Sequence, residues 1–289
     1  MADWKPSGGG DAAAMSAGFG AALGAALGME AESKGPEGTV LMFDMSKRET
    51  HHPNAGFKKL FKRVRSNFKV QVNKDEISLD RLKEATLVVF GAPREKFSSS
   101  EFEAIKTYVA EGGSVLMMLG EGGEGRYGTN VNYLLEEYGI AINSDSVVRT
   151  VYYKYLHPKE VFVSSGVLNR EIAEAASKLS RGKESNRGPR PILSSDSSKS
   201  HSGLDFVYPR GATLNVQKPA VPILSSGFIS YPLNRPVAAV FSNKKSGGRI
   251  AVLGTAEVFG DEYLAKEENT KLQDILFSWL LRSGDDSGA

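Results

Sequence analysis

Short apolar runs recur along the first half of the chain, and segments with helical periodicity separate them. Such runs are typical of strands that a sheet buries on both faces. We expect buried strands at Thr39–Phe43, Thr86–Phe90 and Ser114–Leu119, and a half-buried strand at Phe68–Val72, where apolar and polar residues alternate. Because strands and helices alternate across short connections, the pattern predicts an α/β fold with a doubly wound, mostly parallel sheet.

The predicted helices lie between these strands. Apolar residues at helical spacing predict one helix within Phe57–Phe68 and another within Val131–Tyr138. Ser98 and Glu101 form a capping-box motif that predicts the start of a further helix, and Gly112 predicts its end.

The second half of the chain predicts more strands than helices. We expect extended segments at Val147–Tyr155 and Glu160–Val163, a helix at Leu168–Leu179 and a mobile polar loop at 181–203. A closing helix, with its apolar stripe from Leu272 to Leu280, is expected to pack back on the sheet. Further strands are expected at Leu204–Val207, Thr213–Val216, Val221–Leu224, Val237–Phe241 and Arg249–Leu253.

Composition narrows the possible chemistry. The 289 residues include no cysteine, which excludes disulfides, thiolate metal sites and a cysteine nucleophile. The formal net charge is +2, from 36 basic and 34 acidic residues, so the overall charge gives no case for nucleic acid binding. No segment is long and apolar enough for direct membrane insertion. Residues 1–38 are rich in Ala and Gly and predict a disordered tail before a folded domain at 39–281.

The Gly-rich segment Gly120–Gly128 is the first candidate site. It follows a predicted strand and precedes a predicted helix, which is where dinucleotide-binding folds hold phosphates. It lacks the spacing and the lysine of a Walker loop, and Glu121 and Glu124 would repel a pyrophosphate. The segment therefore favours a flexible turn over a phosphate site.

The sequence gives little support for a histidine-based metal or catalytic site or for a serine nucleophile. The four histidines, His51, His52, His157 and His201, lack metal-ligand spacing and are expected in surface turns or loops. No Gly-x-Ser-x-Gly elbow is present to carry a serine nucleophile.

Two surfaces could instead meet a partner. The basic face of the helix at Lys58–Arg65 could contact nucleic acid, acidic lipid or tubulin tails, although solvated helix faces commonly look the same. The run Val151–Tyr155 contains three tyrosines, which are enriched at interface hot spots but also occur in half-buried strands.

A family resemblance rests on motifs spread over most of the chain. The first stretch contains Pro93–Phe97, Leu134–Ile140, Val147–Tyr155 and Gly166–Ile172, and the second contains Pro219–Leu224, Tyr231–Pro236 and Gly247–Gly254. The first stretch resembles the fifty-two subunit family of intraflagellar transport complex B. The second stretch is also similar to a wider group of domains with a class I glutamine-amidotransferase-like fold, some of them linked to gliding-type ABC transporters.

The resemblance implies a flavodoxin-like sheet and a non-enzymatic scaffold that needs no cofactor or metal. The resemblance implies enzymatic relatives that use a Cys-His-Glu triad, which a chain without cysteine cannot form. The implied partners are other complex B core subunits and, indirectly, kinesin and dynein motors and ciliary cargo. The implied location is the cilium or flagellum and basal body, with a cytoplasmic pool. The polar end at 282–289 is expected to lead into further segments.

These patterns leave two hypotheses. The first is a scaffold domain that is needed for train and cilium assembly and acts through protein–protein contacts. The second is a sugar- or nucleotide-binding domain that uses the degenerate active-site edge of the sheet. For the first hypothesis, the expected partner-binding residues are Glu121, Glu124, Arg126, Tyr152, Tyr153 and Tyr155.

Overall fold

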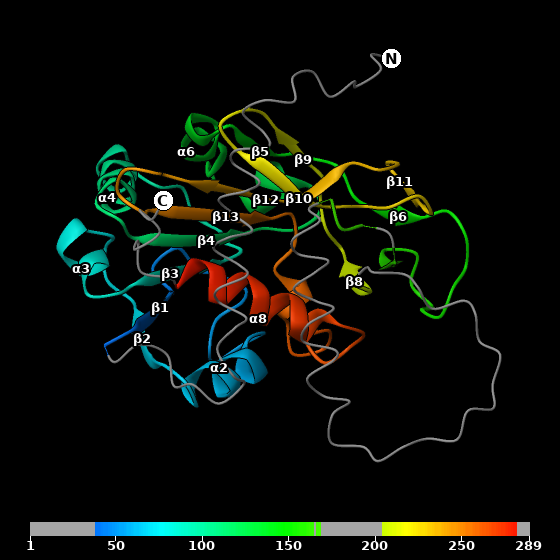
Figure 1. Cartoon of the computed structure of the whole chain (residues 1–289), viewed down its shortest axis with the longest axis horizontal. Coiled ribbons are helices and arrows are strands. Elements are labelled where there is room, and N and C mark those ends of the chain that lie inside the picture. Colours follow the sequence, from blue (N-terminus) through cyan, green and yellow to red (C-terminus); the bar gives the residue numbers. More distant parts are fainter. Residues whose placement is uncertain (1–37, 165, 169–203, 282–289) are drawn as a thin grey trace, which may run out of the picture.

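The computed structural model describes residues 38–164, 166–168 and 204–281. A seven-stranded sheet lies at its centre, in the order β10-β12-β13-β4-β3-β1-β2 (Figure 1). The strands from β13 to β2 run parallel, and β12 and β10 join antiparallel beyond β13. These strands are β1 (Val40–Asp44), β2 (Lys69–Asn73), β3 (Leu87–Gly91), β4 (Ser114–Met118), β10 (Val221–Ser225), β12 (Pro236–Ser242) and β13 (Arg249–Leu253).

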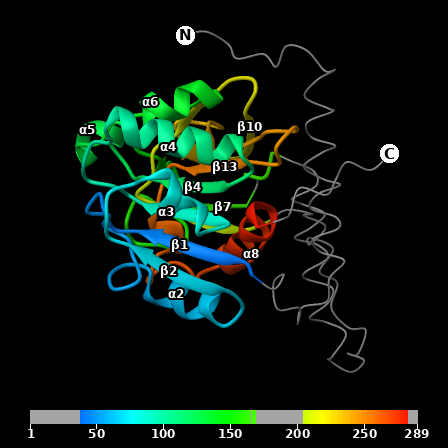
Figure 2. The ribbon, with the colours of Figure 1, turned by 90° about the vertical axis from the view of Figure 1, so that its left-hand side faces the viewer.

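Helices cover both faces of this sheet, as Figure 2 shows from the side. Two helices, α2 (Lys58–Arg65) and α8 (Asn269–Leu280), lie on one face. The other face carries α3 (Leu79–Lys83), α4 (Ser99–Ala110) and α6 (Asn132–Leu135). The remaining helical segments are α5 (Gly123–Tyr127) and the short 3₁₀ helices η1 (Glu136–Tyr138) and η2 (Glu257–Phe259).

Alternate residues of each strand build two separate cores. In β4, Leu116 and Met118 belong to the core under α2 and α8, whereas Val115 and Met117 belong to the core under α4. This division follows from the two-residue repeat of a strand, and it explains why these strands are apolar throughout. The predicted α/β, doubly wound and mostly parallel fold is confirmed.

The predicted helix boundaries around α4 are also confirmed. The Ser98 side chain accepts a hydrogen bond from the Glu101 backbone N–H, and the Glu101 side chain accepts one from Ser98, which completes the capping box. After the helix, Gly112 has φ +105°, a left-handed conformation that side chains with a Cβ rarely adopt.

The second half of the described chain is rich in strands, as predicted. Besides the central sheet, it contributes to three small antiparallel pairs that lie around the carboxyl edge and the β10 end of the sheet. These pairs are β5 (Ile140–Ile142) with β9 (Leu214–Val216), β6 (Val148–Arg149) with β11 (Ser230–Tyr231), and β7 (Glu160–Val163) with β8 (Phe206–Pro209).

Some predictions differ from the structure or fall outside it. The expected strand Val147–Tyr155 is wrong, because only Val148–Arg149 pairs as a strand. The Gly-rich turn contains the short helix α5. The predictions for the 1–38 tail, the 181–203 loop, the 282–289 end and the helix Leu168–Leu179 lie outside the described residues, apart from Gly38 and Leu168. Among the helices described, none is long and apolar enough to cross a membrane.

Candidate functional site

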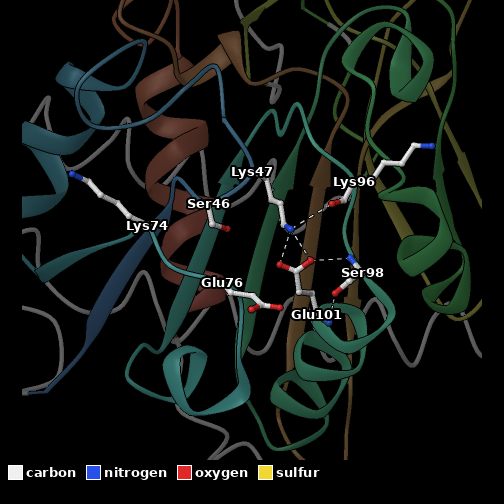
Figure 3. Close-up of a pocket in the computed structure, with 7 residues that line it drawn as sticks. All are labelled: Ser46, Lys47, Lys74, Glu76, Lys96, Ser98 and Glu101. Atoms are coloured by element: carbon white, nitrogen blue, oxygen red, sulfur yellow. Dashed lines mark hydrogen bonds and ion pairs between the residues drawn. The ribbon is translucent and has the colours of Figure 1, made fainter.

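The carboxyl ends of β1, β2 and β3 surround an open polar pocket of about 370 Å³ (Figure 3). The chain leaves β1 toward β2 and then returns to β3 on the other side of β1. This reversal is the point at which doubly wound sheets commonly bind ligands. The lining residues are Ser46, Lys47, Lys74, Glu76, Lys96, Ser98 and Glu101.

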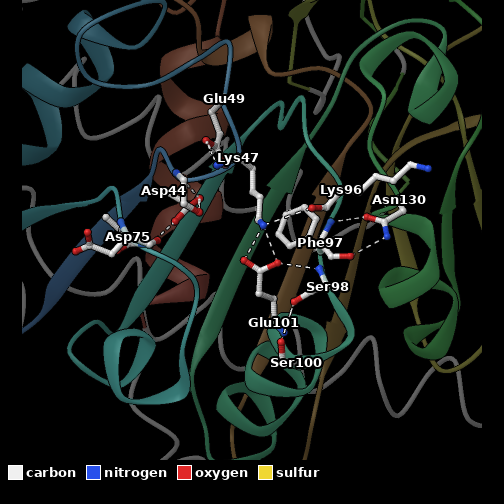
Figure 4. A network of polar contacts seen from close by, with 12 residues as sticks. Asp44, Lys47, Glu49, Asp75, Lys96, Phe97, Ser98, Ser100, Glu101 and Asn130 are labelled. Carbon is white, nitrogen blue, oxygen red and sulfur yellow. Dashed lines mark hydrogen bonds and ion pairs between the residues drawn. The ribbon is translucent and has the colours of Figure 1, made fainter.

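The central charges of this pocket neutralise each other. The Lys47 ammonium lies 2.6 Å from the Glu101 carboxylate, and both side chains are largely buried. Although burial raises the pKa of Glu101, the hydrogen bonds from Lys47 and Ser98 lower it below its usual value. Since Glu101 also completes the capping box of α4, this pair holds the helix against the sheet edge (Figure 4).

A second buried network lies beside the pocket (Figure 4). Asp44 accepts hydrogen bonds from the Ser46 hydroxyl at 2.8 Å and the Asn73 amide at 2.7 Å. Glu49 accepts a bond from the Lys47 backbone N–H at 3.1 Å, and burial together with the nearby Asp44 raises its pKa to about 9. Glu49 is therefore protonated at neutral pH. Nowhere in the described residues do three or more His, Cys, Asp or Glu side chains gather to hold a metal ion.

At the carboxyl end of β4, Glu121 is a buried anchor. It accepts hydrogen bonds from the Lys159 ammonium at 2.5 Å and the Ser146 hydroxyl at 2.8 Å, and it pairs with Arg126. Burial raises the pKa of Glu121, but these three donors outweigh that effect and lower it to about 2. Glu121 thus joins β4 to the start of β7 and presents little of its own surface.

The rest of the Gly-rich segment is also held by local contacts. The Glu124 carboxylate accepts a hydrogen bond from the Asn132 backbone N–H at 2.6 Å, at the start of α6. Gly122 and Gly128 flank α5 with φ +79° and +71°, so glycine is needed for this close reversal of the chain. Of the predicted trio Glu121, Glu124 and Arg126, Arg126 has the most exposed side chain, at 57%.

The aromatic run beyond β6 forms a curled loop. The Arg149 guanidinium donates to the backbone carbonyls of Tyr155, Leu156 and His157, so the chain folds back around it. This tertiary contact explains why no strand continues beyond Arg149. The Tyr155 hydroxyl donates to the Glu267 carboxylate at 2.6 Å and fixes the end of the loop. Tyr152 and Tyr153 remain exposed, at 66% and 52%.

The pairing of β6 with β11 extends this exposed surface. Thr150 donates its backbone N–H to the Ile229 carbonyl at 3.0 Å, which places the loop beside residues 228–233. We call the combined surface the aromatic patch. It consists of large side chains that are 38% to 84% exposed: Val151, Tyr152, Tyr153, Leu156, Phe228, Ile229, Tyr231 and Leu233.

The second half of this patch was not among the predicted site residues. Its sequence signal is the pair Phe228-Ile229 followed by Tyr231, between Gly227 and Pro232. Only the β6–β11 pairing shows that these residues share a surface with Tyr152 and Tyr153.

The histidines give no catalytic arrangement among the described residues. His51 lies in the expected turn region but is half-buried: its ring centroid is 5.2 Å from that of Phe57, and burial lowers its pKa to about 4. His157 is exposed and accepts a hydrogen bond from the Lys159 backbone. His201 lies outside the described residues.

Comparison with known proteins decides the family. A model of the IFT52 GIFT domain matches residues 39–286. The chain belongs to the IFT52 GIFT domain family. The resemblance read from the sequence motifs is thereby confirmed.

Curated relatives agree with this family. The GIFT domain of this chain is 50% identical over 243 residues to the intraflagellar transport protein 52 homolog of Homo sapiens, and 51% identical to that of Mus musculus. Each alignment covers 84% of this chain but only 54% and 55% of the relatives. The chain thus spans about half the length of the curated relatives that it matches.

Solved structures confirm the fold of the GIFT domain. The mmIFT52 N-terminal domain superposes with a TM-score of 0.74 at 47% identity, covering 87% of this chain and 100% of that one. A putative ThuA-like protein from Bacteroides uniformis superposes with a TM-score of 0.51 at 16% identity, covering 89% of this chain and 96% of that one. This second likeness shows the fold alone.

Proposed function

We propose that this GIFT domain is a non-enzymatic, structural part of a subunit of intraflagellar transport complex B, and that it acts through protein–protein contacts. The names of its relatives support a role in intraflagellar transport. The single structural observation that supports docking is the aromatic patch. Groups of exposed large apolar side chains on neighbouring segments mark interaction sites on soluble proteins.

The patch has the composition of an interface core. Tyrosine and phenylalanine are enriched at interface cores, where they bury a large area at a small cost in side-chain entropy. The loop that presents Tyr152 is already ordered by Arg149, whose guanidinium lies 5.0 Å from the Tyr152 ring. Pre-ordering of this kind reduces the entropy lost on binding.

On this proposal the partners are other complex B core subunits, and kinesin and dynein motors and ciliary cargo associate indirectly. The domain then contributes to train assembly and cilium assembly. It is located in the cilium or flagellum and at the basal body, with a cytoplasmic pool. Catalysis has no place in the proposal, because the chain lacks the cysteine of the amidotransferase triad and the Lys47–Glu101 pair occupies the centre of the pocket.

The alternative of a sugar- or nucleotide-binding domain gains nothing from the comparisons. Its best location is the pocket at the switch point, whose central lysine and glutamate are committed to each other. We therefore retain the docking proposal alone.

The test is co-purification of the 289-residue chain with complex B core subunits, comparing Tyr152→Ala and Tyr231→Ala with Tyr133→Ala. Tyr133 is a matched control, because it is 65% exposed but lies on α6, away from the patch. A hot-spot tyrosine contributes about 2 kcal/mol, so each patch variant is expected to weaken binding about thirtyfold.

Two outcomes would contradict the proposal. One is that the unaltered chain co-elutes with none of the core subunits. The other is that it co-elutes and that both patch variants bind as well as Tyr133→Ala. Circular dichroism melting curves of all three variants show whether any loss comes from unfolding instead.

A further inference from the structure

The outer face of α2 carries the densest group of unpaired positive charges in the described structure. At 100° per residue, Lys58, Lys62 and Arg65 lie along one stripe of the helix, and Lys59 lies beside it. Leu60 and Val64, on the opposite side, are buried in the core. Lys69, at the start of the edge strand β2, extends the charged surface. We call Lys58, Lys59, Lys62, Arg65 and Lys69 the basic face.

Five cations that are unpaired in the described structure lie together here, on one helix and the strand that follows it. Some exposed cations elsewhere have an acidic partner, as in Lys83–Glu111 at 2.8 Å and Arg48–Glu95 at 2.7 Å, whereas Lys244 and Lys245 have none among the described residues. On α2 itself, Arg63 pairs with Asp274 of α8 at 2.6 Å. Within the part of the chain that the structure describes, none of the five side chains of the basic face forms an ion pair. A nearly neutral chain, with a net charge of +2, thus concentrates positive potential on one helix.

The side chains around the basic face indicate which class of anionic partner it fits. An amphipathic helix that inserts into a membrane exposes apolar side chains, but the apolar side of α2 is packed under the sheet. Single-stranded nucleic acid needs aromatic stacking platforms, and from residue 38 to residue 132 no large hydrophobic side chain is exposed. Charge without apolar or aromatic contacts fits a hydrophilic acidic chain.

We propose that the basic face binds a Glu- or Asp-rich segment of a partner polypeptide. The stripe from Lys58 to Arg65 is about 10 Å long at 1.5 Å per residue. An extended chain rises about 3.3 Å per residue, so a run of about four residues spans the stripe. Carboxylates on alternate residues, about 6.6 Å apart, match the four-residue step of about 6 Å from Lys58 to Lys62.

This surface is separate from the aromatic patch. In Figure 1, α2 lies at the lower left, near β2, whereas β6 and β11 lie well away from it at the right of the picture. The inference about the basic face can therefore be tested independently of the docking proposed for the aromatic patch.

The test measures binding of a fluorescent decaglutamate peptide to the 289-residue chain by anisotropy, with decaglutamine as the neutral probe. The variant Lys58→Glu/Lys62→Glu is compared with Lys244→Glu/Lys245→Glu, which changes the net charge equally. Lys244 and Lys245 are exposed, lie between β12 and β13, and form no ion pair with other described residues.

We expect the unaltered chain to bind decaglutamate but not decaglutamine. Lys58→Glu/Lys62→Glu should lower the affinity for decaglutamate about tenfold or more, and Lys244→Glu/Lys245→Glu should change it by less than about twofold. Raising the salt from about 0.1 M to about 1 M shortens the Debye length from about 10 Å to about 3 Å and should abolish binding.

The inference is overturned if decaglutamate does not bind at the lower salt, or if both double variants weaken binding equally. It is also overturned if anionic phosphatidylserine vesicles bind through the basic face and decaglutamate does not. Matching melting curves of the two double variants show that neither loss reflects unfolding.

Discussion

At the residue scale, the buried carboxyl of Glu49 links the stability of the domain to pH. Its pKa is raised to about 9 in the folded chain, so the folded state holds a proton that the unfolded state releases above about pH 4.5. The contribution of Glu49 to the free energy of unfolding is fully present below its unfolded-state pKa of 4.5 and is lost as the pH rises through about 9. A hydrogen bond with the Asp44 side chain also favours the protonated form of Glu49.

The first prediction is therefore that Glu49→Gln stabilises the domain at neutral pH, by about 2 to 3 kcal/mol at pH 7. Gln matches the shape of the protonated carboxyl, and its oxygen can still accept the bond from Lys47. Urea unfolding from about pH 5 to about pH 9 should show the advantage of the variant growing with pH. Glu76→Gln, at an exposed position without an ion pair to other described residues, is the control. A pH-independent difference between Glu49→Gln and the unaltered chain would contradict the prediction.

Glu121 predicts the opposite pH dependence. Its folded-state pKa is lowered to about 2, so the stability it contributes is present above about pH 4.5 and is lost as the pH falls through about 2. At pH 7, Glu121→Gln should destabilise the domain by about 2 kcal/mol, because the half-buried Lys159 loses its partner. The control is Glu103→Gln, which should cost less than about 1 kcal/mol, because Glu103 is 69% exposed and its partner Lys106 keeps a second ion pair with Glu137. If Glu121→Gln and Glu103→Gln lowered the urea midpoint equally, the prediction would be wrong.

At the scale of secondary-structure elements, Arg149 holds the loop that presents the aromatic patch. Its guanidinium donates to three consecutive carbonyls, from Tyr155 to His157. The compact ammonium of lysine lacks the planar, spread-out donors that these three bonds require. We predict that Arg149→Lys increases hydrogen exchange of residues 150–158 about tenfold or more, while the central sheet is unchanged.

Mass spectrometry of exchange in peptides from this loop measures the effect. The control is Arg48→Lys, at a site where the arginine side chain is 83% exposed and pairs with Glu95. Unchanged exchange in the loop would show that Arg149 is not what orders it.

The sequence predicted well the helices and strands whose position depends on their own residues rather than on contacts with distant segments. The strands β1, β3 and β4 are buried on both faces, so their apolar runs are uninterrupted. The capping box of α4 is likewise local. In contrast, α3 has five residues and one buried side chain, Leu82, so it shows no periodicity. The extended strand expected after Arg149 failed because a tertiary contact overrides the strand preference of tyrosine and valine.

The same distinction applies to the candidate site. Tyr152 and Tyr153 could be selected from sequence because they adjoin in one short run. Phe228 and Tyr231 could not be joined to them, since only the β6–β11 pairing brings the two segments together. Glu121 and Glu124 belong to the Gly-rich segment that the sequence singled out, and the structure uses both carboxylates in internal contacts.

At the scale of the whole molecule, the central sheet separates two cores but also connects them. Leu116 and Val115 are neighbours in β4 and face opposite cores, so neither core can lose its packing without disturbing the strand that both share. The closing helix α8 comes from the far end of the chain and covers the same face as α2. Residues 39–281 are accordingly expected to unfold as one domain.

The last prediction tests that expectation with one cavity in each core. Leu276→Ala removes buried volume under α8, and Ile105→Ala removes it under α4; both side chains are at most 2% exposed. Each substitution should cost about 2 to 5 kcal/mol. Because the cores share one sheet, each variant should still unfold in a single urea transition with an unchanged slope, whether followed by tryptophan fluorescence or by circular dichroism. If Leu276→Ala instead melts the α8 face first, the two probes will give separate midpoints, and the two faces of the sheet must then be treated as independent folding units.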